Sequence, residues 1–182
     1  MQPDLQPLHL QNEFVQLSPL RPSDFERLYQ VASDPLIWEQ HPNKNRYQKE
    51  VFQNFFEGAI KSMGAFIVFD AATRQVIGSS RFCNYDAANS VVEIGYTFLA
   101  RDHWGNTYNK ALKTLMLDHA FTFAGKVRFF IGANNIRSQK SIVRIGATKI
   151  GEETIAYYGE AEKLNYIYQI EKTNWMLPQQ PL

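Results

Sequence analysis

The strongest constraint on the fold is a change in the spacing of hydrophobic residues at Gly64, from a helical period before it to a strand-like period after it. Three segments with strand-like patterning follow it, AFIVFD (65–70), VIGSSRFCNYD (76–86) and VVEIGYTFLA (91–100), and short polar turns join them. Consecutive strands with such short connections favour an antiparallel meander.

Helical and strand-like patterns flank this meander on both sides. Before it come a strand at 14–20 and two helices, in RPSDFERLYQVASD and YQKEVFQNFFEGAIKSM. After it come a helix at 105–124, a strand KVRFFIGA, a short helix IRSQKSIVRIGA and two further strands. The order β-α-α-β-β-β-α-β-α-β-β predicts a mixed α/β fold, with helices flanking one twisted, mostly antiparallel sheet.

Length and charge limit the organisation and the partners. With 182 residues, 45% of them hydrophobic, we expect a single domain over 1–182, with frayed ends at about 1–11 and 178–182. Nineteen Lys and Arg oppose eighteen Asp and Glu, so the net charge of +1 favours neither nucleic acid nor an anionic membrane as a partner. With no stretch apolar enough to span a membrane, we expect a cytoplasmic protein.

The cysteine and histidine residues give no metal-binding pattern. A single cysteine, Cys83, excludes an intrachain disulfide and a cysteine-based zinc site. His9, His41, His103 and His119 are scattered without ligand spacing, so we expect no metal. No recognisable motif places a histidine beside Cys83. We therefore expect Cys83 to act as a small hydrophobic residue rather than as a nucleophile.

Glu93 is unusual because it lies in the apolar segment VVEIGYTFLA. Gly95 suggests a β-bulge, since a glycine inside a strand often marks one, and a bulge re-aims the neighbouring side chains. Such a bulge would bring Glu93 and Tyr96 to a common side. A regular strand with a solvent-facing Glu93 remains an alternative from these residues alone.

The stretch HWGNTYNKALKTLML (103–117) places Gly105 and small polar residues before an amphipathic helix whose apolar face we expect to contain Tyr108, Leu112, Leu115, Met116, His119 and Phe123. Free backbone N–H groups and the positive end of the helix dipole can bind an anion there. A helix cap without a ligand is the alternative for this loop in isolation.

Taken together, these motifs resemble the GNAT superfamily of acyl-CoA-dependent N-acetyltransferases, and within it the RimJ/RimL-type ribosomal-protein acetyltransferases. The resemblance rests on EIGYTFL, then WG…N…K, then NNIRSQKSIVRIGA, in this order and spacing, and it extends over nearly the whole chain. It implies a GNAT-like fold with a bulged central strand, with acetyl-CoA as cosubstrate and an amine as acceptor.

The resemblance also implies where acetyl-CoA binds. The residues that match the family's bulged strand and phosphate loop are Tyr96, Thr97, Phe98, Leu99, Trp104, Gly105, Asn106, Thr107, Tyr108 and Asn109. The loop departs from the usual Gln/Arg-x-x-Gly-x-Gly/Ala pattern at Trp104, Thr107 and Asn109. Because any residue supplies a backbone N–H, Gly105 alone can meet the need for an unusual φ.

A second group of implied site residues lies in NNIRSQK. Asn135 matches an asparagine that contacts the CoA arm, Ser138 lies three residues later near the thioester sulfur, and Arg137 can hold a CoA phosphate or be solvated. Many relatives place a tyrosine seven residues after the asparagine, as the acid for the departing thiolate. This chain has Ile142 there, so Ser138 or a bound water is the candidate.

The implied mechanism is direct attack of a neutral amine on the thioester, without a covalent enzyme intermediate. Glu93 is the candidate base, and a backbone N–H near Phe98 would polarise the carbonyl group. The walls of the acceptor pocket are expected to include Trp38, Phe66, Arg81, Tyr96 and Trp104, with Arg81 able to bind a carboxylate.

Three classes of function stay open at this point. The first is an N-acetyltransferase acting on a protein N-terminal α-amino group, a small amine or an amino acid, as a monomer or homodimer. The second is a non-catalytic acyl-CoA-binding or regulatory module of the same fold. The third is an interaction protein in which the 104–109 loop is only a helix cap.

Overall fold

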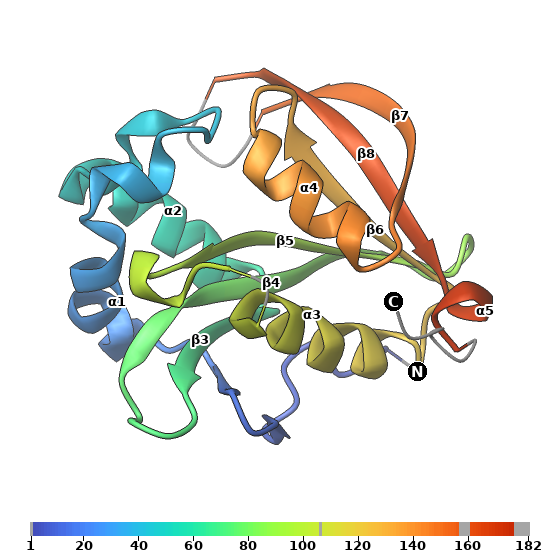
Figure 1. Ribbon diagram of the computed structural model, residues 1–182, viewed down its shortest axis with the longest axis horizontal. Helices are drawn as coiled ribbons and strands as arrows, with labels where there is room; N and C mark the ends of the chain where they lie inside the picture. Colours follow the sequence, from blue (N-terminus) through green and yellow to red (C-terminus); the bar gives the residue numbers. More distant parts are fainter. Residues whose placement is uncertain (1, 106, 157–160, 177–182) are drawn as a thin grey trace.

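A computed structural model of the chain describes residues 2–105, 107–156 and 161–176 (Figure 1). Its strands form one eight-stranded sheet in the order β1-β2-β3-β4-β5-β6-β8-β7. They are β1 (Leu10–Gln11), β2 (Val15–Pro19), β3 (Ala65–Asp70), β4 (Val76–Asp86), β5 (Val91–Leu99), β6 (Lys126–Gly132), β7 (Thr148–Ile155) and β8 (Lys163–Glu171). The predicted mixed α/β class and the meander β3–β4–β5 are confirmed.

The helices flank the sheet, as predicted (Figure 1). The α-helices are α1 (Phe25–Ala32), α2 (Lys49–Lys61), α3 (Thr107–Ala120), α4 (Ile136–Arg144) and α5 (Lys172–Trp175). Short 3-10 helices are η1 (Pro22–Asp24), η2 (Pro35–Trp38), η3 (Lys44–Tyr47) and η4 (Arg101–His103).

Strand β3 shows how the two faces of the sheet are covered. Phe66 and Val68 belong to a core cluster that also contains residues of α3 and α4, such as Leu112 and Ile142. Ala65 and Ile67, which alternate with them, belong to a second cluster with residues of α1 and α2. The sheet therefore separates the α1–α2 side from the α3–α4 side.

The pairing between β5 and β6 is the one parallel pairing in the described sheet, and it is short. Its register joins Val91 to Lys126, Val92 to Val127 and Glu93 to Arg128. The registered pairs end there, although β5 continues to Leu99 and β6 to Gly132. The two strands consequently diverge in the middle of the sheet.

Two expectations about the elements need correction. The segment 1–11 is not frayed throughout, because Leu10 is buried and pairs with Leu17. The buried residues of α3 are Ala111, Leu112, Lys113, Met116, Leu117 and Ala120, so the buried face is rotated from the predicted one. Apolar residues lie on several sides of this helix, and periodicity alone therefore does not choose between them.

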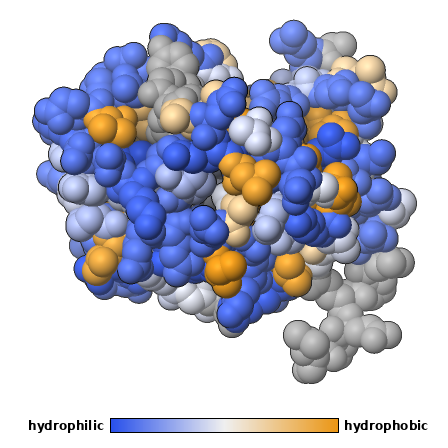
Figure 2. Space-filling view, turned by 90° about the horizontal axis from the view of Figure 1, so that it is seen from above, coloured by the Kyte–Doolittle hydropathy of each residue, from blue (hydrophilic) through white to orange (hydrophobic). Residues whose placement is uncertain are grey.

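The surface seen in Figure 2 is mainly polar, with apolar residues in separate small groups. None of the helices in the described part of the chain is both long and apolar enough to cross a membrane. Residues 178–182, which we expect to be frayed, lie outside the described residues.

Candidate active site

The divergence of β5 and β6 opens a cavity of about 280 Å³. Ile94 to Leu99 line it from β5, and Phe129 to Gly132 line it from β6. Among the predicted site residues, those that line it are Trp38, Tyr96, Thr97, Phe98, Leu99, Trp104, Gly105, Asn109, Asn135, Arg137 and Ser138. The structure therefore brings most of the predicted cofactor residues to one place.

The predicted bulge of β5 is present, and it lies at Tyr96 rather than at Gly95. Ser79 pairs with Phe98 and Arg81 with Gly95, so one intervening residue of β4 faces two of β5. Tyr96 has a φ of 54°, a left-handed conformation that is uncommon for a residue with a side chain. This extra residue turns the Tyr96 ring toward Phe55 on the α2 side.

Glu93 is buried and not solvent-facing. Asn84 Nδ2 donates a hydrogen bond of 2.7 Å to its Oε2, while burial raises the pKa of the carboxyl group. A Cβ atom on Gly95 would lie 3.0 Å from Glu93 Oε1, so the glycine leaves room for this carboxylate. Glu93 does not itself line the cavity, but Gly95 beside it does.

Arg81 and Phe66, which we expect in the acceptor pocket, do not line this cavity. The Arg81 guanidinium donates hydrogen bonds to the carbonyl oxygens of Gly58 and Phe55 in α2, and the Tyr96 ring covers it at 3.8 Å. Phe66 packs against Phe82 in the core on the α3–α4 side. The two residues thus lie on opposite faces of the sheet, a difference that buried strand positions do not reveal in the sequence.

The loop before α3 is held from both ends. Trp104 Nε1 donates a hydrogen bond of 2.9 Å to the Leu99 carbonyl oxygen. Gly105 has a φ of 117°, which only glycine adopts readily, and it lines the cavity. The side chain of Asn109 donates a hydrogen bond of 2.6 Å to Ser141 Oγ, joining α3 to α4.

Two predicted loop residues, Thr107 and Tyr108, do not line the cavity. The Tyr108 hydroxyl donates instead to Asp70 Oδ2 at the end of β3, at 2.7 Å. Thr107 is exposed and does not line the cavity, and Asn106 lies outside the described residues.

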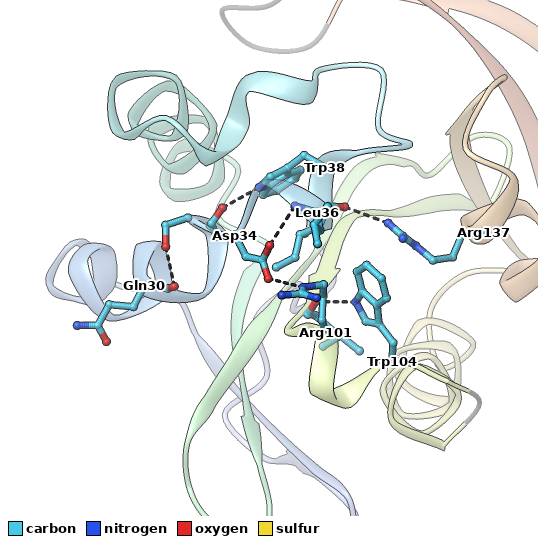
Figure 3. A network of polar contacts seen from close by, with 11 residues as sticks. Gln30, Asp34, Leu36, Trp38, Arg101, Trp104 and Arg137 are labelled. Atoms are coloured by element: carbon cyan, nitrogen blue, oxygen red, sulfur yellow. Dashed lines mark hydrogen bonds and ion pairs between the residues drawn. The ribbon is translucent and has the colours of Figure 1, made fainter.

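Helix α4 starts at the opposite wall of the cavity. Asn135 caps it, because its Oδ1 accepts a hydrogen bond of 3.2 Å from the Ser138 N–H. The Arg137 guanidinium lies 3.9 Å from the centre of the Trp104 ring and donates to the Ile37 carbonyl oxygen. Figure 3 shows the Arg137 side chain beside the Trp104 ring, with both close to the segment that carries Leu36 and Trp38.

Lys113 is a cavity residue that is not among those predicted from the sequence. It is 3% exposed and lines the cavity from α3, one helical turn beyond Asn109. Its Nζ donates a hydrogen bond of 2.6 Å to Thr97 Oγ1. Burial lowers the pKa of the Lys113 amine to about 7. A lysine four residues after a predicted cofactor residue on a helix was the available signal.

Comparison with known protein families decides the assignment. The family model described as "Acetyltransferase (GNAT) domain" matches residues 15–148. The chain belongs to the GNAT acetyltransferase family. None of the curated protein sequences matches it.

Solved structures of GNAT proteins share the fold. A GCN5-related N-acetyltransferase from Brucella melitensis has 18% sequence identity and a TM-score of 0.74, with 91% of this chain and 79% of that chain covered. Mycobacterium smegmatis RimJ, solved with CoA-disulfide, has 19% identity and a TM-score of 0.69, covering 91% and 84%. Spermidine N-acetyltransferase from Vibrio cholerae, solved with CoA and spermine, has 16% identity and a TM-score of 0.67, covering 91% and 99%.

The family assignment makes the chain an acetyltransferase of a family that uses acetyl-CoA and acts on amine acceptors. The RimJ/RimL branch is not confirmed, because RimJ is one distant structural neighbour among many. In the described residues, no group of three or more His, Cys, Asp or Glu side chains could hold a metal ion.

Proposed function

We propose that this GNAT protein transfers the acetyl group of acetyl-CoA to a primary amine by direct attack, using the cavity between β5 and β6. The observation that carries the proposal is the divergence of these strands next to the bulge at Tyr96. Beyond Glu93, the edge of β5 that faces β6 has no registered strand partner in the described sheet. Such an edge offers N–H and C=O groups to an extended ligand.

The charges of the cavity fit a cofactor that carries phosphates. Its described lining residues include Arg46, Lys113, Arg137 and Arg144, and none of them is Asp or Glu. Trp104, Gly105 and Asn109 would hold the phosphate end at the start of α3, with Asn135 and Arg137 on the α4 wall. Acetyl-CoA supplies the activated acetyl thioester.

The same charges bear on the acceptor. A polyamine carries several positive charges that need carboxylate partners, and the described lining of the cavity offers none. We therefore infer that the acceptor is a protein N-terminal α-amino group, as for RimJ/RimL-type enzymes, or a small amine or amino acid without further cationic groups.

Glu93 is the proposed base. It would accept the proton of the acceptor amine through a water molecule, because Gly95 and not Glu93 itself lines the cavity. Its raised pKa suits this role, since a carboxylate with a higher proton affinity is a stronger base. The backbone N–H near Phe98 would polarise the thioester carbonyl.

Calorimetric titration of acetyl-CoA and of CoA, together with thiol-release assays on N-terminal peptides, amino acids and polyamines, tests the proposal. We expect saturable binding, and thiol release that depends on a peptide or amino acid. Binding without release on any amine would favour the non-catalytic acyl-CoA-binding module instead. Lack of binding would contradict both functions and favour the reading of the 104–109 loop as a helix cap.

A further inference from the structure

Lys113 is a buried amine whose described contacts include no carboxylate. A lysine is rarely buried unless it is paired, because desolvating an ammonium group is costly. Lys113 is 3% exposed, and in the described residues no carboxylate lies within salt-bridge distance of it. A residue that burdens stability in this way is a candidate for function.

Hydroxyl groups and one aromatic ring surround the Lys113 amine. Thr97 Oγ1 on β5 lies 2.6 Å from Nζ, and Ser80 Oγ on β4 lies at 3.5 Å. On the β6 side, the centre of the Phe129 ring lies 5.7 Å away. No described titratable side chain thus competes for the proton at close range.

The Lys113 amine lies next to the bulge of β5. Its hydrogen-bond partner Thr97 follows the bulge residue Tyr96 and precedes Phe98 in β5. Asn109, Lys113 and Ser138 all line the same cavity, from α3 and α4. Lys113 therefore lies beside the strand segment proposed to hold the thioester.

We propose that Lys113 is the proton donor to the thiolate that leaves during acyl transfer. This inference rests on the proposed function. When the C–S bond breaks, its electron pair goes to sulfur, and one N–H proton of the Lys113 ammonium goes to the sulfur to form the thiol. Lys113 becomes a neutral amine and regains a proton from solvent. Glu93 releases to solvent the proton it took from the acceptor amine, so the reaction yields amide and CoA.

Lys113 suits this role better than Ser138, the candidate from the sequence. An acid is most effective when its pKa lies near the working pH, and the Lys113 amine meets this condition with its pKa of about 7. A serine hydroxyl holds its proton at neutral pH.

The first test compares wild type with Lys113→Met and Lys113→Arg. Arginine keeps the positive charge but does not release its proton near neutral pH. We expect both variants to lose kcat by about 10²-fold to 10⁴-fold while still binding acetyl-CoA. Lys140→Met, which changes an exposed lysine of α4, is the matched control and should retain wild-type kcat.

The pH profile separates proton donation from a structural role. In wild type, kcat should fall as pH rises through about 7, because Lys113 loses the proton that it donates. The residual kcat of both variants should not show this fall near pH 7. The proposal would be overturned if the variants had kcat values close to wild type, or if their reduced kcat still fell at the same pH.

A second test does not depend on turnover. The ultraviolet absorbance of the CoA thiolate, followed against pH in the protein–CoA complex, reports the pKa of the bound thiol. A nearby ammonium group stabilises the thiolate, and the thiolate in turn holds the proton on Lys113, so the two groups titrate as a coupled pair. We therefore expect the thiol to ionise at lower pH in wild type than in Lys113→Met. Ionisation at the same pH in both would place Lys113 away from the sulfur and refute the inference. A wild-type protein that binds CoA but releases no thiol with any amine would instead refute the proposed function.

Discussion

Replacing Lys113 with methionine should make the protein more stable while impairing catalysis. The pKa of the Lys113 amine falls from its ordinary value of 10.5 to about 7 in the folded protein. A change of one unit in pKa corresponds to about 1.36 kcal/mol. Keeping this buried amine protonated below pH 7 therefore costs about 5 kcal/mol of folding free energy. Methionine has a similar length and removes this cost.

The gain is reduced by the lost hydrogen bond to Thr97. In the variant, Thr97 Oγ1 would retain its hydrogen bonds with Ser80 Oγ at 2.7 Å and with the Gly95 carbonyl oxygen at 3.4 Å, so it is not left without a partner. We subtract about 2 kcal/mol for a hydrogen bond to a charged group and expect Lys113→Met to gain about 3 kcal/mol at pH 6. For a chain of this length, that corresponds to a rise in Tm of about 6–12 °C.

The dependence on pH identifies the cause. Between about pH 7 and 10.5 the unfolded state binds a proton at Lys113 that the folded state does not, so wild-type stability rises with pH in this window. The advantage of Lys113→Met should therefore shrink steadily and be nearly absent by about pH 10. Urea unfolding at several pH values measures the difference in unfolding free energy between the variant and wild type. Other groups that titrate equally in both proteins cancel from this difference. A methionine variant that is less stable at pH 6, or an advantage independent of pH, would refute the reasoning.

Three further predictions concern catalysis and packing. Glu93→Gln should lower kcat by about 10²-fold to 10⁴-fold and leave CoA affinity unchanged in calorimetry; full activity would exclude Glu93 as the base. Phe52→Ala should destabilise the protein by about 3–5 kcal/mol in urea unfolding, because Phe52 is fully buried among aromatic rings of α1 and α2, and a loss below 1 kcal/mol would contradict that packing. Gly64→Ala should reduce stability markedly in thermal unfolding, since its Cβ would lie 2.1 Å from the Phe82 carbonyl oxygen, and an unchanged Tm would show that the strands can separate there.

The sequence allowed the meander and the bulge to be predicted because both depend on local patterns. Alternating hydrophobic residues and short polar turns specify β3 to β5, and a glycine beside a buried glutamate indicates an irregular strand. The position of the bulge was not predictable, because Tyr96 rather than Gly95 takes the positive φ. The Tyr96 ring is held by Arg81 and Phe55, contacts that only the folded chain brings together.

The missed and misplaced site residues have physical reasons that lie outside the local sequence. Whether a strand residue faces α2 or α3 depends on the sheet register, which the sequence of one strand does not specify, and Phe66 faces the α3–α4 side on that account. Arg81 does face α2, but its guanidinium is held there by the carbonyl oxygens of Gly58 and Phe55. Lys113 was missed because the buried face of α3 is rotated from the predicted one. The contact of Arg137 with Ile37 joins residues a hundred positions apart, beyond the reach of any local pattern.

The short register between β5 and β6 also has consequences for local unfolding. With pairing confined to Val91–Glu93 and Lys126–Arg128, the sheet consists of two blocks, β1–β5 and β6–β8–β7, joined by few backbone hydrogen bonds. Such blocks can open separately, and amides along the unpaired edge of β5 exchange with solvent sooner than those between β3 and β4. A ligand lying between the blocks would couple them into one cooperative unit, so slower hydrogen exchange should reach β6 and β8 as well as the strand that it contacts.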